Sequence, residues 1–128
     1  CKLDLKSKTL QFSGAMNPLI HISGEELNIH KGDPQPIGYL SGKETSFTSH
    51  SVKIKKGDMV YIFSDGFQDQ FGGEKGKKYR SLKFRNLLQS ISDKSTDEQK
   101  ELIEQEFTSW LGDYEQIDDV CVMGVKVT

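Results

Sequence analysis

Two acidic points stand beside the most apolar stretches of the chain. Asp65 directly follows a run of β-favouring residues at positions 59–63, and Asp118 and Asp119 precede a second such run at 120–127. Apolar runs of this length are typical of buried strands. If the two strands were antiparallel neighbours, about 4.8 Å apart, the acidic points would lie at the same edge of a sheet. Carboxylates so placed share a cation, and oxygen ligands suit Mg²⁺ or Mn²⁺.

A simpler interpretation of both acidic points stays open. Asp and Gly are ordinary turn residues, so Asp65 and Gly66 would merely end a strand with a tight backbone bend. Asp118 and Asp119 would in the same way cap a turn before the last strand. On this interpretation the acids are structural and bind no cation.

Other kinds of site receive less support. The three histidines have no cysteine or carboxylate at ligand spacing and are predicted to lie on the surface; they are His21, His30 and His50. The sequence contains no Gly-x-Ser-x-Gly elbow and no Walker or Rossmann glycine pattern. A short basic cluster, Lys75, Lys77 and Lys78, is predicted to belong to an exposed loop at 74–78, where it could also meet an anionic substrate.

Strands that would position the acids dominate the first half of the chain. Alternating polar and apolar residues predict one hairpin over 2–6 and 9–13 and another over 19–22 and 27–30. A Gly/Pro-rich segment at 31–38 follows. A long strand is predicted over 45–54, before the apolar run at 59–63.

Helices follow Asp65. We expect one helical turn around residues 67–71 and then a helix capped by Ser81, in which Phe84, Leu87, Leu88 and Ile91 follow i, i+3, i+4 and i+7 spacing. Ser95 and Glu98 form a capping box for a second helix, which Gly112 ends. That helix is predicted to bury Leu102, Ile103, Phe107, Trp110 and Leu111. Hairpins followed by grouped helices and a final strand predict an α+β fold.

Composition narrows the classes of protein. The chain has 128 residues, which is enough for one domain or part of one. Its net charge of −2 gives no basic field, so we expect no nucleic-acid partner. No apolar run approaches the ~20 residues that span a bilayer, so we expect no direct membrane contact. Two cysteines make no disulfide framework, which favours a reduced, cytoplasmic setting. Because a strand pattern starts at once after Cys1, we expect the chain to be part of a longer one.

Four motifs in order resemble the metal-dependent serine/threonine phosphatases of the type 2C class, in their bacterial SpoIIE-like branch. Residues 12–19 (FSGAMNPL) resemble that branch's Ala-Gly-His-Pro-Pro loop, with Met16 near the histidine position. Residues 36–38 (PIG) match a Pro-(Leu/Ile)-Gly element. Residues 61–66 (YIFSDG), followed by 69–72 (DQFG), resemble the strand-Thr/Ser-Asp-Gly motif, and 118–122 (DDVCV) the closing Asp-Asp strand. The ordered set covers nearly the whole chain and is more specific than any one motif.

The resemblance implies a fold and a site. The fold is the C-terminal part of a two-sheet antiparallel β-sandwich flanked by helices, with residues 1–128 as the C-terminal portion of a SpoIIE-like phosphatase domain. Asp65 and Asp118 match catalytic, metal-binding aspartates, and Asp119 matches a less constant neighbour that supports or joins the metal site. The complete domain would hold two Mn²⁺ or Mg²⁺ ions that activate a water for phosphoester hydrolysis. Its other ligands lie in an upstream half, so this piece alone is expected to be inactive.

Partners and location also follow from the resemblance. The implied substrates are phosphoserine and phosphothreonine proteins, such as an anti-anti-sigma-like regulator, which would make the protein a bacterial signalling enzyme of sigma-factor regulation. An upstream sensor or membrane segment of the same chain would control a cytoplasmic domain. An exposed sheet edge is able to pair with a second copy, so a homodimer is one expected arrangement. The alternative is a non-catalytic protein-interaction module derived from the same fold.

Overall fold

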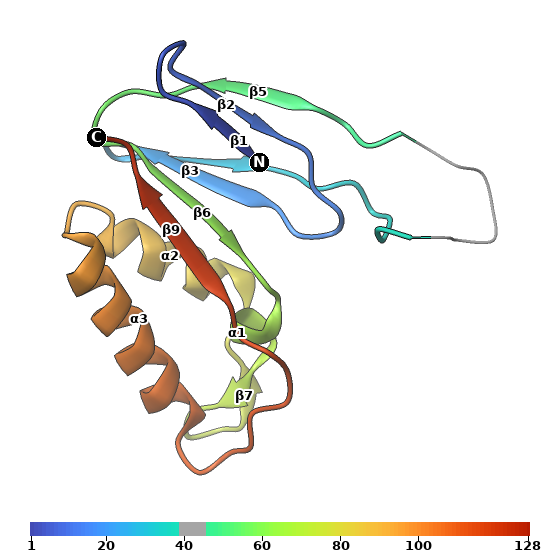
Figure 1. Ribbon diagram of the computed structural model, residues 1–128. Coiled ribbons are helices and arrows are strands. Elements are labelled where there is room, and N and C mark those ends of the chain that lie inside the picture. The colour runs from blue at the N-terminus through green and yellow to red at the C-terminus, as the bar shows by residue number, and fades with distance from the viewer. Residues whose placement is uncertain (39–45) are drawn as a thin grey trace. The chain divides into compact units, whose positions relative to one another are not determined.

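The computed structural model describes residues 1–38 and 46–128. The chain divides into two compact units: the first holds Cys1–Ile62 and Lys126–Thr128, and the second holds Phe63–Val125. None of the described helices is long and apolar enough to span a membrane. Within the units the structure has antiparallel sheets and a few helices, so the predicted α+β class is confirmed (Figure 1).

Two antiparallel sheets make up the first unit. One contains β1 (Lys2–Asp4), β2 (Thr9–Phe12) and β5 (His50–Lys53), with β2 in the middle. In the other, β3 (Leu19–Ser23) lies between β4 (Glu26–His30) and β6 (Met59–Phe63). Both predicted hairpins are present, as β1–β2 and β3–β4, because their alternating patterns match the register of the ladders.

The core of the first unit lies between these two sheets. Buried apolar side chains from both sheets, from the loop before β6 and from the end of the chain form one cluster, namely Leu10, Phe12, Leu19, Ile54, Val60 and Val127. Two backbone hydrogen bonds fix Val127: its N–H donates to the Asp58 carbonyl, and its carbonyl accepts from the Gly57 N–H, both at 2.8 Å. The last residues therefore complete the core that the first residues begin.

The predicted strand over 45–54 is shorter than expected. Regular pairing covers only His50–Lys53, and Thr45 lies outside the described residues. Thr48 instead donates its backbone N–H and its hydroxyl to the two carboxylate oxygens of Asp33, at 2.7 and 2.8 Å. The same bonds hold the pKa of Asp33 below its usual value. Side-chain bonding thus replaces ladder bonding before β5.

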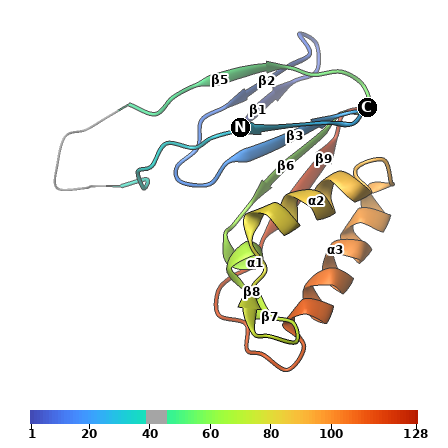
Figure 2. The same ribbon diagram turned by 180° about the vertical axis from the view of Figure 1, so that it is seen from behind.

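Helices and strands are both found in the second unit. The order is α1 (Gly66–Asp69), β7 (Phe71–Gly72), β8 (Lys77–Lys78), α2 (Ser81–Ile91), α3 (Thr96–Leu111) and β9 (Val122–Lys126), whose last residue belongs to the first unit. Figure 2 shows the β7–β8 hairpin beside α1. Lys77 and Lys78 were predicted to lie in a loop, and this is wrong. Gly73 and Gly76, with φ of 68° and 54°, turn the chain back so that β7 and β8 pair.

The helix ends match two of the three predicted signals. Ser95 and Glu98 form the capping box of α3, and Gly112, with φ of 53°, ends that helix. The prediction that Ser81 caps α2 is wrong, because Ser81 is the first helical residue of α2. The capping position is taken by Arg80 in a backbone conformation with φ of 75°.

An aromatic core holds the second unit together. The ring of Phe67 lies 5.0 Å from Tyr79, 4.8 Å from Phe84 and 5.0 Å from Phe107, between ring centroids. Tyr79 in turn meets Trp110 edge to face at 5.2 Å. Phe84 of the α2 stripe and Phe107 and Trp110 of the α3 stripe therefore take part in this core. The α3 stripe is only half-buried, and the fully buried residue of that helix is Gln99.

The ammonium group of Lys83 lies over this core. Its Nζ is 4.3 Å from the Tyr79 ring centroid, 4.1 Å from that of Trp110 and 3.0 Å from Glu106 Oε1. Burial and the nearby Glu106 raise the pKa of Tyr79, so its hydroxyl stays protonated and donates to Glu106 Oε1 at 2.9 Å. The cation therefore ties α2 to α3 through two ring faces and one carboxylate.

We expect Lys83→Met, which keeps the aliphatic stem and removes the charge, to lower the free energy of unfolding by about 1 kcal/mol. Lys83→Arg, which keeps a cation over the rings, should lose less. The matched control is Lys100→Met, whose exposed partner Glu104 lies 3.9 Å away and contributes about 0.5 kcal/mol or less. Urea unfolding measures all three. Equal losses for Lys83→Met and Lys100→Met would mean that the ring contacts add nothing.

Candidate active site

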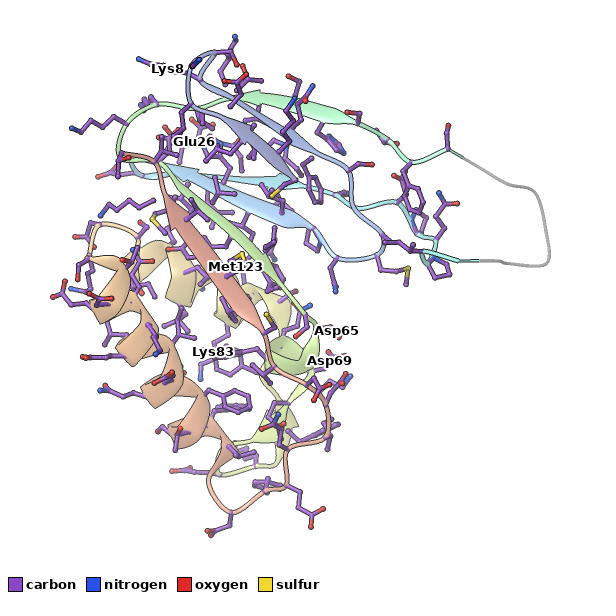
Figure 3. All side chains as sticks on the ribbon, in the orientation of Figure 1. Lys8, Glu26, Asp65, Asp69, Lys83 and Met123 are labelled. Atoms are coloured by element: carbon purple, nitrogen blue, oxygen red, sulfur yellow. The ribbon has the colours of Figure 1, made fainter. Side chains whose placement is uncertain are left out.

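Asp65 stands at the junction of a core strand and a short helix. The strand β6 ends at Phe63, and Asp65 occupies the position before α1 with φ of −77° and ψ of −13°. Its side chain makes no capping hydrogen bond and is exposed (Figure 3). The backbone carbonyl alone closes the first helical turn, by accepting from the Asp69 N–H at 2.9 Å. The Asp65 carboxylate therefore does not cap the helix that it precedes.

Ser64 brings the second acidic segment to this point. Its hydroxyl donates to the Asp119 carbonyl and accepts from the Cys121 N–H, both at 2.9 Å. Its backbone N–H donates to the Cys121 carbonyl at 3.0 Å. Three hydrogen bonds thus place residues 119–121 alongside 64–66, although the two segments are over fifty positions apart in the sequence. The predicted closeness of Asp65 to Asp118 and Asp119 is therefore present at the level of the backbone.

Gly66 is required by this close approach. A Cβ atom built on Gly66 would lie 2.3 Å from the Asp119 carbonyl oxygen, well inside contact distance. The sequence suggested that this glycine permits a tight bend, yet its φ is not among the positive values in the chain. Its role is to leave room for the acidic segment.

The Asp118 side chain is partly fixed by its own neighbours. Its Oδ1 accepts from the Asp119 N–H at 2.7 Å, and its carbonyl accepts from Gln116 Nε2 at 2.8 Å. The segment 113–119 is exposed. One carboxylate oxygen of Asp118 is therefore held by the backbone donor of the next residue.

The chemistry of these donors fits a hard divalent cation in part. Three exposed aspartates lie on two adjoining segments, and none of the ion pairs among the described residues engages them. Oxygen ligands of this kind suit Mg²⁺ and Mn²⁺. Within the described residues, however, no three His, Cys, Asp or Glu side chains are grouped closely enough to hold a metal ion. The residues fit as a partial ligand set that needs further oxygen donors.

A lysine of the basic cluster pairs with the last residue of α1. Lys78 Nζ is 3.3 Å from Asp69 Oδ2 and 5.8 Å from the centroid of the Phe71 ring. Asp69 ends the helix that Asp65 begins, and Figure 3 labels both. The charge of Lys78 is thus paired with a carboxylate of the same unit.

Gln70 is the polar residue that sequence reasoning missed. Its side chain has 0% exposure, and its amide group bonds to backbone groups of residues 115 and 117, just before the acidic pair. The one available signal was its spacing of three positions from Phe67 within the predicted helical turn at 67–71, although α1 ends at Asp69 and Gln70 is extended. That spacing predicts burial, and it does not reveal the partner.

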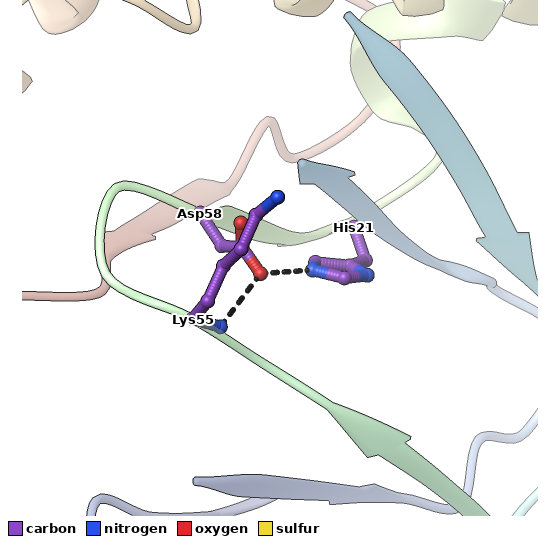
Figure 4. Close-up of polar contacts among 3 residues, drawn as sticks. All are labelled: His21, Lys55 and Asp58. Atoms are coloured by element: carbon purple, nitrogen blue, oxygen red, sulfur yellow. Dashed lines mark hydrogen bonds and ion pairs between the residues drawn. The ribbon is translucent and has the colours of Figure 1, made fainter. Parts of the chain in front are cut away.

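The histidines differ from their predicted surface position. His21 is 5% exposed, and its Nε2 donates to Asp58 Oδ2 at 2.8 Å (Figure 4). His30 lies between the other two, with ring centroids 6.3 Å from His21 and 5.8 Å from His50. Burial, followed by the charges of those two rings, lowers the pKa of His30. The surface prediction is wrong for His21 because its strand, β3, is buried along most of its length.

The loop that lacks the expected histidine is built on backbone contacts. Met16 has φ of 63° and donates its N–H to the Asp33 carbonyl at 2.8 Å. Asp33 donates its own N–H to the Gly14 carbonyl at 2.8 Å. The loop is therefore ordered by residue 33 in the first unit, whichever side chain stands at position 16.

Comparisons with known proteins identify the family of the chain. The family model described as Stage II sporulation protein E (SpoIIE) matches residues 1–128. No curated protein matches the sequence. Among solved structures, the chain is similar to the SiaA-PP2C domain of Pseudomonas aeruginosa, with 28% identity and a TM-score of 0.87 over 97% of this chain and 48% of that one.

Two structures from Bacillus subtilis share the fold. The PP2C phosphatase domain of SpoIIE with a fragment of its regulatory domain has 20% identity and a TM-score of 0.75, over 97% of this chain and 35% of that one. The SpoIIE phosphatase domain presoaked with Mn has 19% identity and a TM-score of 0.71, over 98% and 53%. The chain thus spans about half or less of the length of each of these solved chains.

Proposed function

Because the chain belongs to the SpoIIE family, we propose that it is the C-terminal portion of a metal-dependent phosphatase domain that hydrolyses phosphoserine and phosphothreonine esters in proteins. One observation carries the proposal. The three hydrogen bonds of Ser64 place the Asp65 segment and the Asp118–Asp119 segment side by side, as a shared cation site requires. Two acids that served only as turn residues would not need to meet.

In this proposal the aspartates act as cation ligands. Asp65 and Asp118 contribute carboxylate oxygens, and Asp119 supports the site or joins it as a third ligand. The two Mn²⁺ or Mg²⁺ ions would supply an activated water and neutralise charge on the phosphoryl oxygens. Since the described residues form only a partial ligand set, the other half of the domain must provide the remaining oxygens.

The proposed substrate is a phosphorylated regulatory protein of the anti-anti-sigma type. An upstream sensor region of the same chain is proposed to control the domain. The SpoIIE structure with a regulatory-domain fragment supports such an arrangement, because it joins a phosphatase domain and a regulatory segment in one chain. A cytoplasmic setting and dimerisation through an exposed sheet edge are further parts of the proposal.

The direct test compares the full-length protein with the 128-residue chain. We expect the full-length protein to release phosphate from a phosphoserine protein only with Mn²⁺ or Mg²⁺, to lose the activity in EDTA, and to regain it when metal is restored. The 128-residue chain should show no release above background and should bind Mn²⁺ only weakly in a calorimetric titration, since it lacks a complete ligand set.

Three results would contradict the proposal or its corollary. Metal-independent activity of the full-length protein would contradict the metal-dependent mechanism. No activity with any phosphoprotein tested would favour the non-catalytic interaction module. Turnover by the 128-residue chain itself would show that its ligand set is sufficient.

A further inference from the structure

The side-chain amide of Gln70 bonds to the backbone in the way that a peptide group would. Its Nε2 donates to the Glu115 carbonyl at 2.8 Å, and its Oε1 accepts from the Ile117 N–H at 3.4 Å. The second Nε2 hydrogen is satisfied by the Phe71 carbonyl at 2.9 Å. Donating to one residue and accepting from the residue two positions on is the bonding of a strand beside its neighbour. The side-chain amide of Gln70 therefore makes the two hydrogen bonds to residues 115 and 117 that a neighbouring strand would make.

The backbone of Gln70 is fixed as firmly as its side chain. Its carbonyl accepts from Trp110 Nε1 at 3.1 Å and from the Tyr79 N–H at 3.0 Å. These two partners belong to the aromatic core of the second unit. An amide with 0% exposure would be costly if it were unpaired, and here each of its polar atoms has a partner. Gln70 thus connects a rigid core to a solvent-exposed segment.

A second clamp acts on the other side of Asp118. As described above, the Ser64 hydroxyl bonds to the Asp119 carbonyl and to the Cys121 N–H. Gln70 holds residues 115 and 117, and Ser64 holds residues 119 and 121. Asp118 lies between the residues held by Gln70 and those held by Ser64. Asp65 lies in the sequence between Ser64 and Gln70 themselves. The stretch 64–70 therefore bonds to the residues on both sides of Asp118, and it contains Asp65.

We infer that Gln70, together with Ser64, is a positioning residue that sets Asp118 relative to Asp65 for cation binding. The inference rests on the proposed function. It assigns Gln70 a role that its burial alone would not require: removing its amide should loosen the segment 115–121 and weaken the cation site, even where the rest of the unit stays folded. Groups that hold metal ligands in place commonly contribute about 10–100-fold to metal affinity.

The experiment compares two buried glutamines of the second unit in the full-length protein. Gln70→Met removes the amide at similar volume. The matched control is Gln99→Met, because Gln99 is 3% exposed and its Nε2 donates to the carbonyls of Ser92 and Lys94 at 3.4 and 3.0 Å, at the connection between α2 and α3. Hydrogen exchange at the amides of residues 117, 119 and 121 is measured without metal, and Mn²⁺ affinity is measured by calorimetry.

We expect Gln70→Met to speed exchange at these amides and to weaken Mn²⁺ binding by about tenfold or more. Gln99→Met should change neither the exchange rates nor the Mn²⁺ affinity by more than twofold, even if its urea midpoint falls as far as that of Gln70→Met. If Gln70→Met does not fold, Ser64→Ala serves as the second variant, with the same two expected changes. Exchange or affinity that matches the Gln99→Met control would overturn the inference.

Failure of the proposed function would look different. Wild-type protein that binds no Mn²⁺, with Asp65→Asn and Asp118→Asn indistinguishable from it, would overturn both the metal-dependent activity and the positioning role toward a cation. Faster exchange in Gln70→Met with unchanged Mn²⁺ affinity would overturn the positioning role alone and leave the proposed function standing.

Discussion

Replacing Asp65 by asparagine in the full-length protein is expected to lower Mn²⁺-dependent phosphate release by about a thousandfold. A metal site stabilises the transition state by several kcal/mol, and each ~1.4 kcal/mol is a tenfold change in rate. Folding should be unaffected, because asparagine is as good a residue before a helix as aspartate and the Asp65 side chain makes no capping bond. Rate measured against metal concentration, with a urea unfolding curve, checks both statements.

Asp118→Asn should behave alike, because its carboxylate belongs to the same proposed site. The matched control is Asp113→Asn, an exposed aspartate of the same connecting segment, which should retain the wild-type rate. If Asp65→Asn and Asp118→Asn both keep full metal-dependent activity, neither carboxylate is a ligand, and the two acids revert to turn residues.

The largest effect on stability is expected at Asp58. This side chain is 1% exposed, and its Oδ2 accepts from His21 Nε2 at 2.8 Å and from the Lys55 N–H at 2.9 Å (Figure 4). Asp58→Ala leaves both donors without an acceptor in the first unit. Breaking a buried pair in this way costs about 3–5 kcal/mol, which urea unfolding at pH 7 will measure. The double variant with His21→Ala should lose less than the two single losses added together.

The contribution of Asp58 has a defined pH window. Burial alone would raise its pKa, but the hydrogen bonds from His21 and Lys55 outweigh burial and hold it below the ordinary value of 3.8. The folded state therefore favours the carboxylate, and the stabilisation is fully present above pH 3.8 and lost as pH falls through the lower, folded value. The gap between wild type and Asp58→Asn should close only in that acid range. The control is Asp4, which accepts solvent-exposed hydrogen bonds from the Lys6 and Ser7 N–H groups, and Asp4→Asn should cost far less.

Local signals in the sequence predicted most of the regular structure. The capping box at Ser95 and Glu98 and the glycine at 112 fixed the ends of α3, because their hydrogen bonds lie within a few residues of each other. Alternation predicted the hairpins, and an unbroken apolar run predicted the buried strand β6. The places of the acids at the ends of two strands also predicted which acidic segments would lie side by side. In each case the information lies within one short stretch, or within a resemblance that orders several.

The residues whose contacts the sequence did not predict have a common feature, which is a polar partner far away in the sequence. Gln70 bonds to a residue 45 positions away, and His21 bonds to one 37 positions away. Periodicity reports which face of an element is buried, and it carries no information about a polar partner on another element. Thr48 was assigned to a strand for the same reason, because its bond to Asp33 spans 15 positions. Long-range polar pairs of this kind emerge only when the chain is folded.

The division of the chain has a consequence for how it folds. The second unit is an excursion from the first, which starts at Cys1, stops at Ile62 and resumes at Lys126. Val127 therefore reaches its partners Gly57 and Asp58 only after a long loop has closed, and such closure slows the formation of non-local contacts. The bonds between Ser64 and Cys121 shorten that loop, because they join the two ends of the excursion. Once the second unit has formed, the entropy cost of bringing Val127 to Gly57 and Asp58 is therefore lower.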